Sequence, residues 1–426
     1  MVTKNNKKGT FKSHVGNILN EARIRIHNLS PKLAISIISI VIAILIIEVI
    51  LRLTSEKTYG LDKCQSLDEE FHHVMIPNRQ CRFKTDEWDV VYKINSMSLR
   101  DMEYTLNKPE GIFRILVLGD SFAQGHGVDI DESFPKLLER RLNFQDNANI
   151  EIINSGVFAY SPLVEYLFLK KKGVLFEPDL VIIAFTPTDF WEDRQRFKEL
   201  ELSYPGSSAE EIEEKIFDGS AKFKFENINS INTKSARPKS LLPFLPFRVK
   251  SWLKENLRVY SKLVNFIKAG NSPVQQNVLH LGDIDKDIMA IQRGDKISDE
   301  DWEKLWILPV KYLGMMKKIL DEQKVPMVVV IIPDPAQISD REWPGRKLLG
   351  YPEHFVDTRT PFEEELTRRL KALDISSINL LPDFKKSSIF PLYFDNDGHW
   401  RESGHKVATE IIYEGLTRMG ILVNKF

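Results

Sequence analysis

The sequence predicts an α/β protein built around a sheet of parallel strands. Segments rich in helical periodicity separate five short apolar segments that have the composition of buried strands, at residues 113–118, 150–154, 180–185, 326–332 and 376–380. Strands that alternate with helices are typical of a parallel sheet covered on both faces. We therefore expect a flavodoxin-like three-layer sandwich.

The segments between and around these strands complete the predicted domain. Helical spacing is found at residues 134–142, 302–322, 362–372 and 404–419. Residues 54–110 form a mixed lead-in, with strand-like alternation at 88–94, and the main domain follows over 111–426. A charge-rich insert spans about 191–300. We expect its aromatic and basic segments at 238–249 and 252–267 to form a helical cap over the sheet; a lid that shapes an acyl-acceptor site or rests on a membrane surface is the alternative.

The first predicted strand runs directly into a turn that carries Gly119, Asp120 and Ser121. A serine at the carboxyl end of a first parallel strand lies where open α/β sheets bind ligands. The alternative is an ordinary loop with a surface serine, and this segment alone does not separate the two.

A second polar loop, near the C-terminus, carries Asp395, Asp397 and His399. Serine is a poor nucleophile that needs a base to take its proton, and the base needs an acceptor that fixes its tautomer. An Asp-x-His pair can fill both roles if the fold brings it against Ser121. The two segments together therefore predict a Ser-His-Asp triad.

The two segments together resemble the SGNH (GDSL-type) hydrolase superfamily over about residues 114–416. Gly119-Asp120-Ser121 matches the first block of that superfamily, Gly156 fits the glycine of the second, and Asp397 and His399 match the last. The resemblance implies the SGNH hydrolase fold, with Ser121 as nucleophile, His399 as base, Asp397 as acid, and the amides of Ser121 and Gly156 in the oxyanion hole.

The chain departs from the family pattern at the third block, which usually reads Gly-x-Asn-Asp. Thr188 stands where the oxyanion-binding Asn is expected. A threonine hydroxyl donates one hydrogen bond and reaches less far than a carboxamide. Thr188 therefore either substitutes imperfectly as the third oxyanion donor, or the substrate sits differently.

The second departure concerns the spacing of the acid. The family's acid usually stands three residues before the histidine, where this chain has Asn396. The Asp-x-His-Trp form around His399 is similar to the branch that contains the alginate O-acetylation proteins. Asp397 is the first choice for the triad acid, and Asp395 is the alternative.

Composition excludes several other classes of function. The 426 residues are 42% hydrophobic and 10% aromatic, as in a globular protein with a sizeable core. A formal net charge of −1 offers nucleic acid no electrostatic attraction. Two cysteines provide no zinc-type spacing, and no glycine-rich phosphate loop is present. We therefore expect neither a metal nor a cofactor.

The N-terminal region predicts a membrane anchor. Residues 1–32 form a basic leader in which Glu21 is the single acidic residue, and an apolar segment follows over 33–53. A helix from 33 to 51 would be about 28 Å long, close to one hydrocarbon core. The basic flank favours a cytoplasmic N-terminus, and no small-residue cleavage site follows. An uncleaved single-pass anchor with an extracytoplasmic main domain is expected; a buried helix of a soluble protein is the alternative.

Cys64 and Cys81 are the two cysteines of the chain, and both follow the predicted anchor. In an exported domain they are spaced to close a short loop, and a disulfide there would stabilise the fold by ~3 kcal/mol. Two separate buried thiols are the alternative.

These expectations combine into one functional interpretation. The chain reads as a membrane-anchored extracytoplasmic serine esterase or O-acyltransferase that acts on ester-linked acyl groups, acetyl above all, of envelope glycans or lipids. The sequence does not separate hydrolysis from transfer, because the difference lies in water exclusion and acceptor binding. A catalytically decayed SGNH-fold module that binds glycan is the alternative, since Thr188 could mark a lost site.

Overall fold

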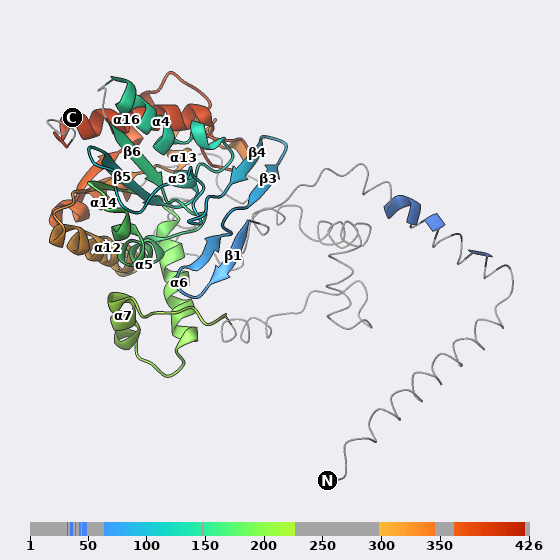
Figure 1. Ribbon diagram of the computed structural model, residues 1–426, viewed down its shortest axis with the longest axis horizontal. Coiled ribbons are helices and arrows are strands. Elements are labelled where there is room, and N and C mark those ends of the chain that lie inside the picture. Colours follow the sequence, from blue (N-terminus) through green and yellow to red (C-terminus); the bar gives the residue numbers. More distant parts are fainter. Residues whose placement is uncertain are drawn as a thin grey trace, which may run out of the picture. The chain divides into compact units, whose positions relative to one another are not determined.

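The computed structural model describes residues 64–145, 149–225, 298–345 and 362–421, together with single positions between 32 and 48 (Figure 1). The chain divides into two compact units, Met1–Glu56 with Lys239–Gln275, and Lys57–Pro238 with Gln276–Phe426. The second unit contains the sheet and the candidate site.

The predicted leader and most of the predicted anchor at 33–53 lie outside the described residues. Among the helices that the structure does describe, none is both long enough and apolar enough to cross a membrane.

The centre of the second unit is a five-stranded parallel sheet. Its strand order is β6-β5-β7-β8-β9. The strands are β5 (Phe113–Gly119), β6 (Ile150–Asn154), β7 (Leu180–Phe185), β8 (Met327–Ile331) and β9 (Ser376–Asn379). Every residue of β5, β7 and β8 is buried, as expected for strands covered on both faces. The predicted parallel α/β sheet is confirmed.

Helices cover both faces of this sheet (Figure 1). One face packs against α4 (Phe134–Gln145) and α16 (Glu402–Arg418). The other packs against α5 (Pro162–Lys171), α6 (Asp189–Ser203), α12 (Asp299–Glu322) and α14 (Phe362–Ala372). Successive residues of a strand point to opposite faces of the sheet. In β5, Leu116 and Leu118 therefore pack in one core, and Ile115 and Val117 pack in the other.

The lead-in folds as two antiparallel hairpins that share the core of the second unit. They are β1 (Gln65–Asp68) with β2 (His72–Met75), and β3 (Gln80–Lys84) with β4 (Asp89–Lys93). A disulfide joins Cys64 to Cys81 across a Cα–Cα distance of 5.9 Å. Cys81 also lies opposite Tyr92 in the second hairpin. The disulfide therefore ties the start of the lead-in to the hairpin that reaches the site.

The insert predicted at about 191–300 is described up to residue 225 and from residue 298. Its first part includes most of α6, which packs against α5 and α12 as a layer of the sandwich. A second helix, α7 (Ala209–Asp218), follows with a capping box between Ser208 and Glu211. The segments at 238–249 and 252–267, for which a cap or a lid was considered, lie outside the described residues.

The strand order fixes where a ligand site is expected. The chain passes from β5 to β6 on one side and then returns to place β7 on the other side of β5. In open α/β sheets, ligands bind outside the carboxyl ends of the strands at such a switch point. The turns that follow β5 and β7 carry Ser121 and Thr188 respectively.

Candidate active site

The turn after β5, here called the serine turn (residues 119–125), is built around the carboxylate of Asp120. Its Oδ1 accepts the N–H of Phe122 at 2.8 Å and so caps the short helix α3 (Ser121–Gln124). Its Oδ2 accepts the hydroxyl of Thr186, from the end of β7, at 3.0 Å. One carboxylate therefore fixes the first turn of α3 and ties it to the neighbouring strand, which holds Ser121 in place.

Ser121 contacts a histidine that lies 278 positions away in the sequence. Its Oγ is 2.7 Å from Nε2 of His399, and the Nδ1 of His399 is hydrogen-bonded to Oδ1 of Asp397. The structure thus brings together the three residues that the sequence predicted as a triad. A serine placed on an imidazole that is itself held by a carboxylate can pass its proton to that ring.

The second loop, here called the Asp-His loop (residues 393–400), is fixed by backbone contacts and a tight turn. Phe394 donates its N–H to the carbonyl of His399 at 2.8 Å, which closes the loop. Gly398 has φ +79, and a Cβ there would meet the ring of Trp343 at 3.0 Å. Only glycine suits both conditions, so the turn can place Asp397 and His399 side by side.

The structure also distinguishes the two candidate acids. Asp397 contacts the His399 ring, whereas the half-exposed carboxylate of Asp395 pairs with Arg401 at 3.1 Å. The backbone N–H of Asp395 donates at 2.6 Å to Glu87, a residue between β3 and β4 of the lead-in. Asp395 therefore shapes the loop, and it is not the partner of the imidazole.

The charges of the imidazole and the carboxylate stabilise each other. Burial opposes a charged ring, but the adjacent carboxylate outweighs that effect and raises the pKa of His399 above its ordinary value of 6.5. Burial likewise opposes the ionised acid, yet His399 and His126 hold the pKa of Asp397 well below its ordinary range. Asp397 is thus ionised at neutral pH, and His399 becomes a free base only as the pH rises through its raised pKa.

The three predicted oxyanion donors lie around the serine turn, but two of them already have partners within the chain. The N–H of Gly156 donates to Oδ1 of Asn154 at 3.0 Å. Thr188 is exposed, and its hydroxyl lies 2.9 Å from that of Thr186. Because Thr186 gives its own proton to Asp120, Thr188 is the donor in that pair. Both groups would have to exchange these partners to bind an oxyanion.

Asp120 of the serine turn belongs to a group of five buried acids, which the sequence analysis did not single out as a group. Burial raises the pKa of each of them, and their mutual repulsion adds to this effect for most. The pKa of Asp193 rises to about 7. The members are Asp120, Glu165, Asp189, Glu192 and Asp193.

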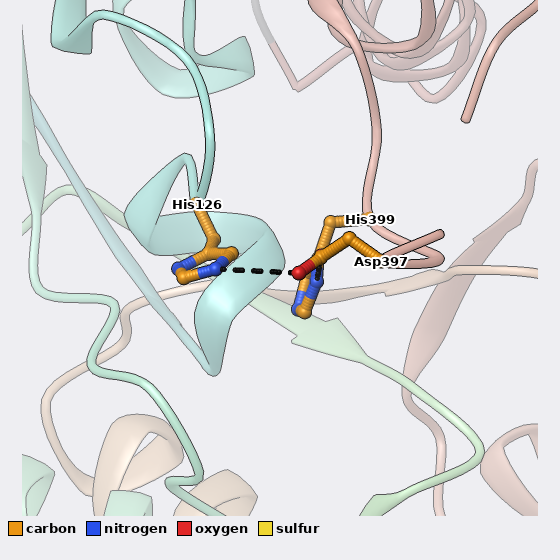
Figure 2. Close-up of side chains that lie close together, drawn as sticks. All are labelled: His126, Asp397 and His399. Carbon is orange, nitrogen blue, oxygen red and sulfur yellow. Dashed lines mark hydrogen bonds and ion pairs between the residues drawn. The ribbon is translucent and has the colours of Figure 1, made fainter. Parts of the chain in front are cut away.

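His126, which directly follows the serine turn, is the site residue that the sequence analysis missed. Figure 2 shows its ring facing the carboxylate of Asp397 beside His399. Within the described part of the chain, these three form the one set whose ligand atoms could hold a metal ion, all lying within 4.8 Å of one another. In this arrangement Nδ1 of His399 and Oδ1 of Asp397 are hydrogen-bonded to each other.

No family model matches this chain, and no curated protein does. Among solved structures it is similar to that of TesA (10% identity, TM-score 0.36, covering 72% of this chain and 99% of that one). It is also similar to the acetyl xylan esterase AlAXEase (10%, 0.35, 71% and 100%) and to the esterase EstA from Pseudoalteromonas sp. (12%, 0.33, 72% and 97%). Likenesses at these scores indicate nothing about the function of this chain, and only the geometry of its site bears on that function.

Proposed function

We propose that the chain is an SGNH-type serine hydrolase or acyltransferase that acts on ester-linked acyl groups. The observation that carries this proposal is the chain of contacts from Ser121 Oγ through the His399 ring to Asp397, at the switch point of the sheet. The raised pKa of His399 and the ionised state of Asp397 suit a base that must hold a proton during the reaction.

In the proposed mechanism, Ser121 Oγ attacks the ester carbonyl while His399 Nε2 takes the hydroxyl proton. The tetrahedral oxyanion would be stabilised by the amides of Ser121 and Gly156 and by the hydroxyl of Thr188. His399 then gives its proton to the leaving alcohol as the ester bond breaks, which leaves an acyl group on Ser121. A second hydroxyl, activated by His399, takes the acyl group and restores the serine.

The identity of that second hydroxyl separates two candidate functions. Water makes the protein an esterase, and a sugar hydroxyl makes it an O-acyltransferase. The Asp-x-His-Trp form of the Asp-His loop, with its resemblance to the alginate O-acetylation branch, favours acyl transfer as the second candidate. We expect acetylated glycans of the cell envelope as substrates, with acylated lipids as the alternative. Acetate released without an acceptor measures hydrolysis. When an oligosaccharide acceptor is added, the acetylated oligosaccharide measures transfer.

The enzymatic proposal is tested by covalent labelling of the full-length protein with a fluorophosphonate. Wild-type protein is expected to be labelled and to hydrolyse p-nitrophenyl acetate, and Ser121→Ala is expected to lose both properties while remaining folded. Ser96→Ala serves as the matched control, because Ser96 lies in an exposed turn and pairs with Glu103. A wild-type protein that is neither labelled nor active would support the decayed glycan-binding module instead.

We also propose that the segment at 33–53 anchors the protein, with its N-terminus in the cytoplasm and the site outside. The basic leader at 1–32 and the disulfide between Cys64 and Cys81 support this proposal, because disulfides persist in oxidising compartments. A reporter fused after Phe426 should behave as exported, and the protein should stay with membranes after an alkaline wash. Release by the wash would contradict the anchor.

A further inference from the structure

We propose that His126, with Tyr92 behind it, is a positioning residue for the triad of Ser121, His399 and Asp397. In this inference His126 acts as a neutral N–H donor that holds the second carboxylate oxygen of Asp397. The inference rests on the proposed function, since it assigns His126 a part in the same reaction.

The two oxygens of Asp397 face two different imidazoles (Figure 2). Oδ1 accepts the hydrogen bond from His399 Nδ1, and Oδ2 lies 3.8 Å from Nε2 of His126. That distance exceeds the ~2.7–3.2 Å of a hydrogen bond, and a movement of less than about 1 Å would close it. Such contacts are often loose before substrate binds and tighten in the complex. His126 is therefore placed to fix the orientation of the carboxylate through the oxygen that His399 does not use, while its ring lies 4.6 Å from that of His399, centroid to centroid.

Contacts behind His126 select the tautomer that this role needs. The hydroxyl oxygen of Tyr92 accepts the N–H of Gly127 at 3.3 Å and lies 3.2 Å from Nδ1 of His126. If Tyr92 donates its proton to Nδ1, the ring carries its own hydrogen on Nε2, facing Asp397. The other tautomer would turn a lone pair of Nε2 toward the carboxylate, which is repulsive. From both contacts we assign the ring hydrogen of His126 to Nε2.

The charge state of His126 agrees with a donor that never titrates during the reaction. Burial lowers its pKa to about 3, and His399 and Arg100 add to this although Asp397 opposes it. Burial also raises the pKa of Tyr92, so its hydroxyl keeps its proton. The guanidinium of Arg100 lies 3.5 Å from the centroid of the Tyr92 ring, and it strengthens that hydroxyl as a donor. Among the described residues, the titratable and charged groups that face His126 are His399, Asp397, Arg100 and Tyr92.

Packing holds the ring in this orientation. Trp88 and Phe158 lie against it, with ring centroids 5.0 and 5.4 Å away. The backbone N–H of His126 donates to the carbonyl of Ser121 at 2.9 Å. The residue is thus joined directly to the serine turn, while its side chain reaches Asp397. A histidine that only filled space would not need both of its ring nitrogens directed at polar partners.

The test compares three variants of the full-length protein by their pH profiles of kcat/KM for p-nitrophenyl acetate. In His126→Phe the ring is kept and the donor is lost, so kcat should fall about 10- to 100-fold with little change in KM. The acidic limb should also move to higher pH, because an uncompensated Asp397 attracts the protonated form of His399 more strongly. His126→Gln retains an N–H donor and should stay within about threefold of wild type.

Tyr92→Phe provides a milder variant if His126→Phe does not fold. It removes the proton that selects the tautomer, and we expect kcat to fall about 3- to 10-fold with the same direction of shift in the acidic limb. Tyr166→Phe is its matched control, since that buried hydroxyl donates to the carbonyl of Phe217, away from the site. The control should lower the melting temperature without moving the pH profile.

The outcomes separate this inference from the proposed function. An active wild type whose pH profile moves in neither His126→Phe nor Tyr92→Phe would overturn the role of His126 alone. Equal losses in His126→Gln and His126→Phe, with unmoved limbs, would reduce His126 to a packing residue. A wild type that fails to react with the fluorophosphonate would instead refute the catalytic triad, and this inference would fail with it.

Discussion

Replacing Asp397 by Asn is the sharpest single test of the proposed site, because it changes one charge and almost no volume. In the structure, Oδ1 of Asp397 holds Nδ1 of His399, and His126 faces the other oxygen. An Asn in this place has a single acceptor oxygen for two imidazoles. If its amide nitrogen turns toward His399, the ring must change its tautomer and can no longer accept the proton of Ser121 on Nε2.

The expected loss follows from the charge that is removed. A carboxylate and an imidazolium about 4 Å apart attract each other by ~4 kcal/mol at an effective dielectric constant of ~20. At about 1.4 kcal/mol per factor of ten, this corresponds to ~10³ in rate, and the wrong tautomer adds to it. We therefore expect kcat for Asp397→Asn to fall by about 10³- to 10⁴-fold.

Asp395→Asn is the matched control for this experiment. Its half-exposed pair with Arg401 is worth only ~0–1 kcal/mol, so the rate should fall less than about fivefold. Both variants are assayed with p-nitrophenyl acetate, and folding is checked by circular dichroism. In any residual activity of Asp397→Asn the acidic limb should lie at lower pH, since the attraction that raises the pKa of His399 is gone. A larger loss in Asp395→Asn than in Asp397→Asn would refute the assignment.

Three further predictions concern the oxyanion hole, the disulfide and the buried acids. Thr188→Val should lower kcat about 10- to 1000-fold with KM unchanged, if its hydroxyl leaves Thr186 to bind the oxyanion; a silent change would remove it from the hole. Replacing Cys64 and Cys81 by Ala should lower the free energy of unfolding in urea by ~3 kcal/mol, and wild type treated with a reductant should match the variant. Burial raises the pKa of Asp193 from 3.8 to about 7, so its favourable contribution is complete below pH ~4 and is lost as the pH rises through 7. Asp193→Asn, whose amide oxygen can still accept the N–H of Leu163, should therefore lose less unfolding free energy than wild type between pH 5 and pH 8; equal losses would contradict the raised pKa.

The strands were predictable because their signal is local. A central strand is a run of consecutive apolar residues, which can be recognised in the sequence directly. Residues 150–154 and 180–185 form strands over the predicted ranges. The role of helix α6 was harder to predict, because its sequence does not show that it is buried. Helix α6 buries Glu192, Asp193 and Arg196, so its sequence looks like a charged surface segment although it packs in a layer of the sandwich.

The serine, the histidine and the acid could be found from sequence because each lies in a short polar segment at a strand end. The residues that support them could not. His126 stands between two glycines, and its contact with Asp397 depends on a loop 271 positions later in the chain. Glu87 accepts the N–H groups of Asp395 and Asn396 at 2.6 and 3.0 Å, a contact between distant segments that no local pattern indicates.

The second hairpin of the lead-in has a consequence for how the protein can be dissected. Its tip supplies Glu87 to the Asp-His loop, and β4 supplies Tyr92 to His126. The disulfide fastens this hairpin to residue 64. A truncated protein that began at β5 would keep all five strands of the sheet and would lose both supports of the reacting groups. The smallest fragment that retains full activity should therefore begin before Cys64, well upstream of the sheet.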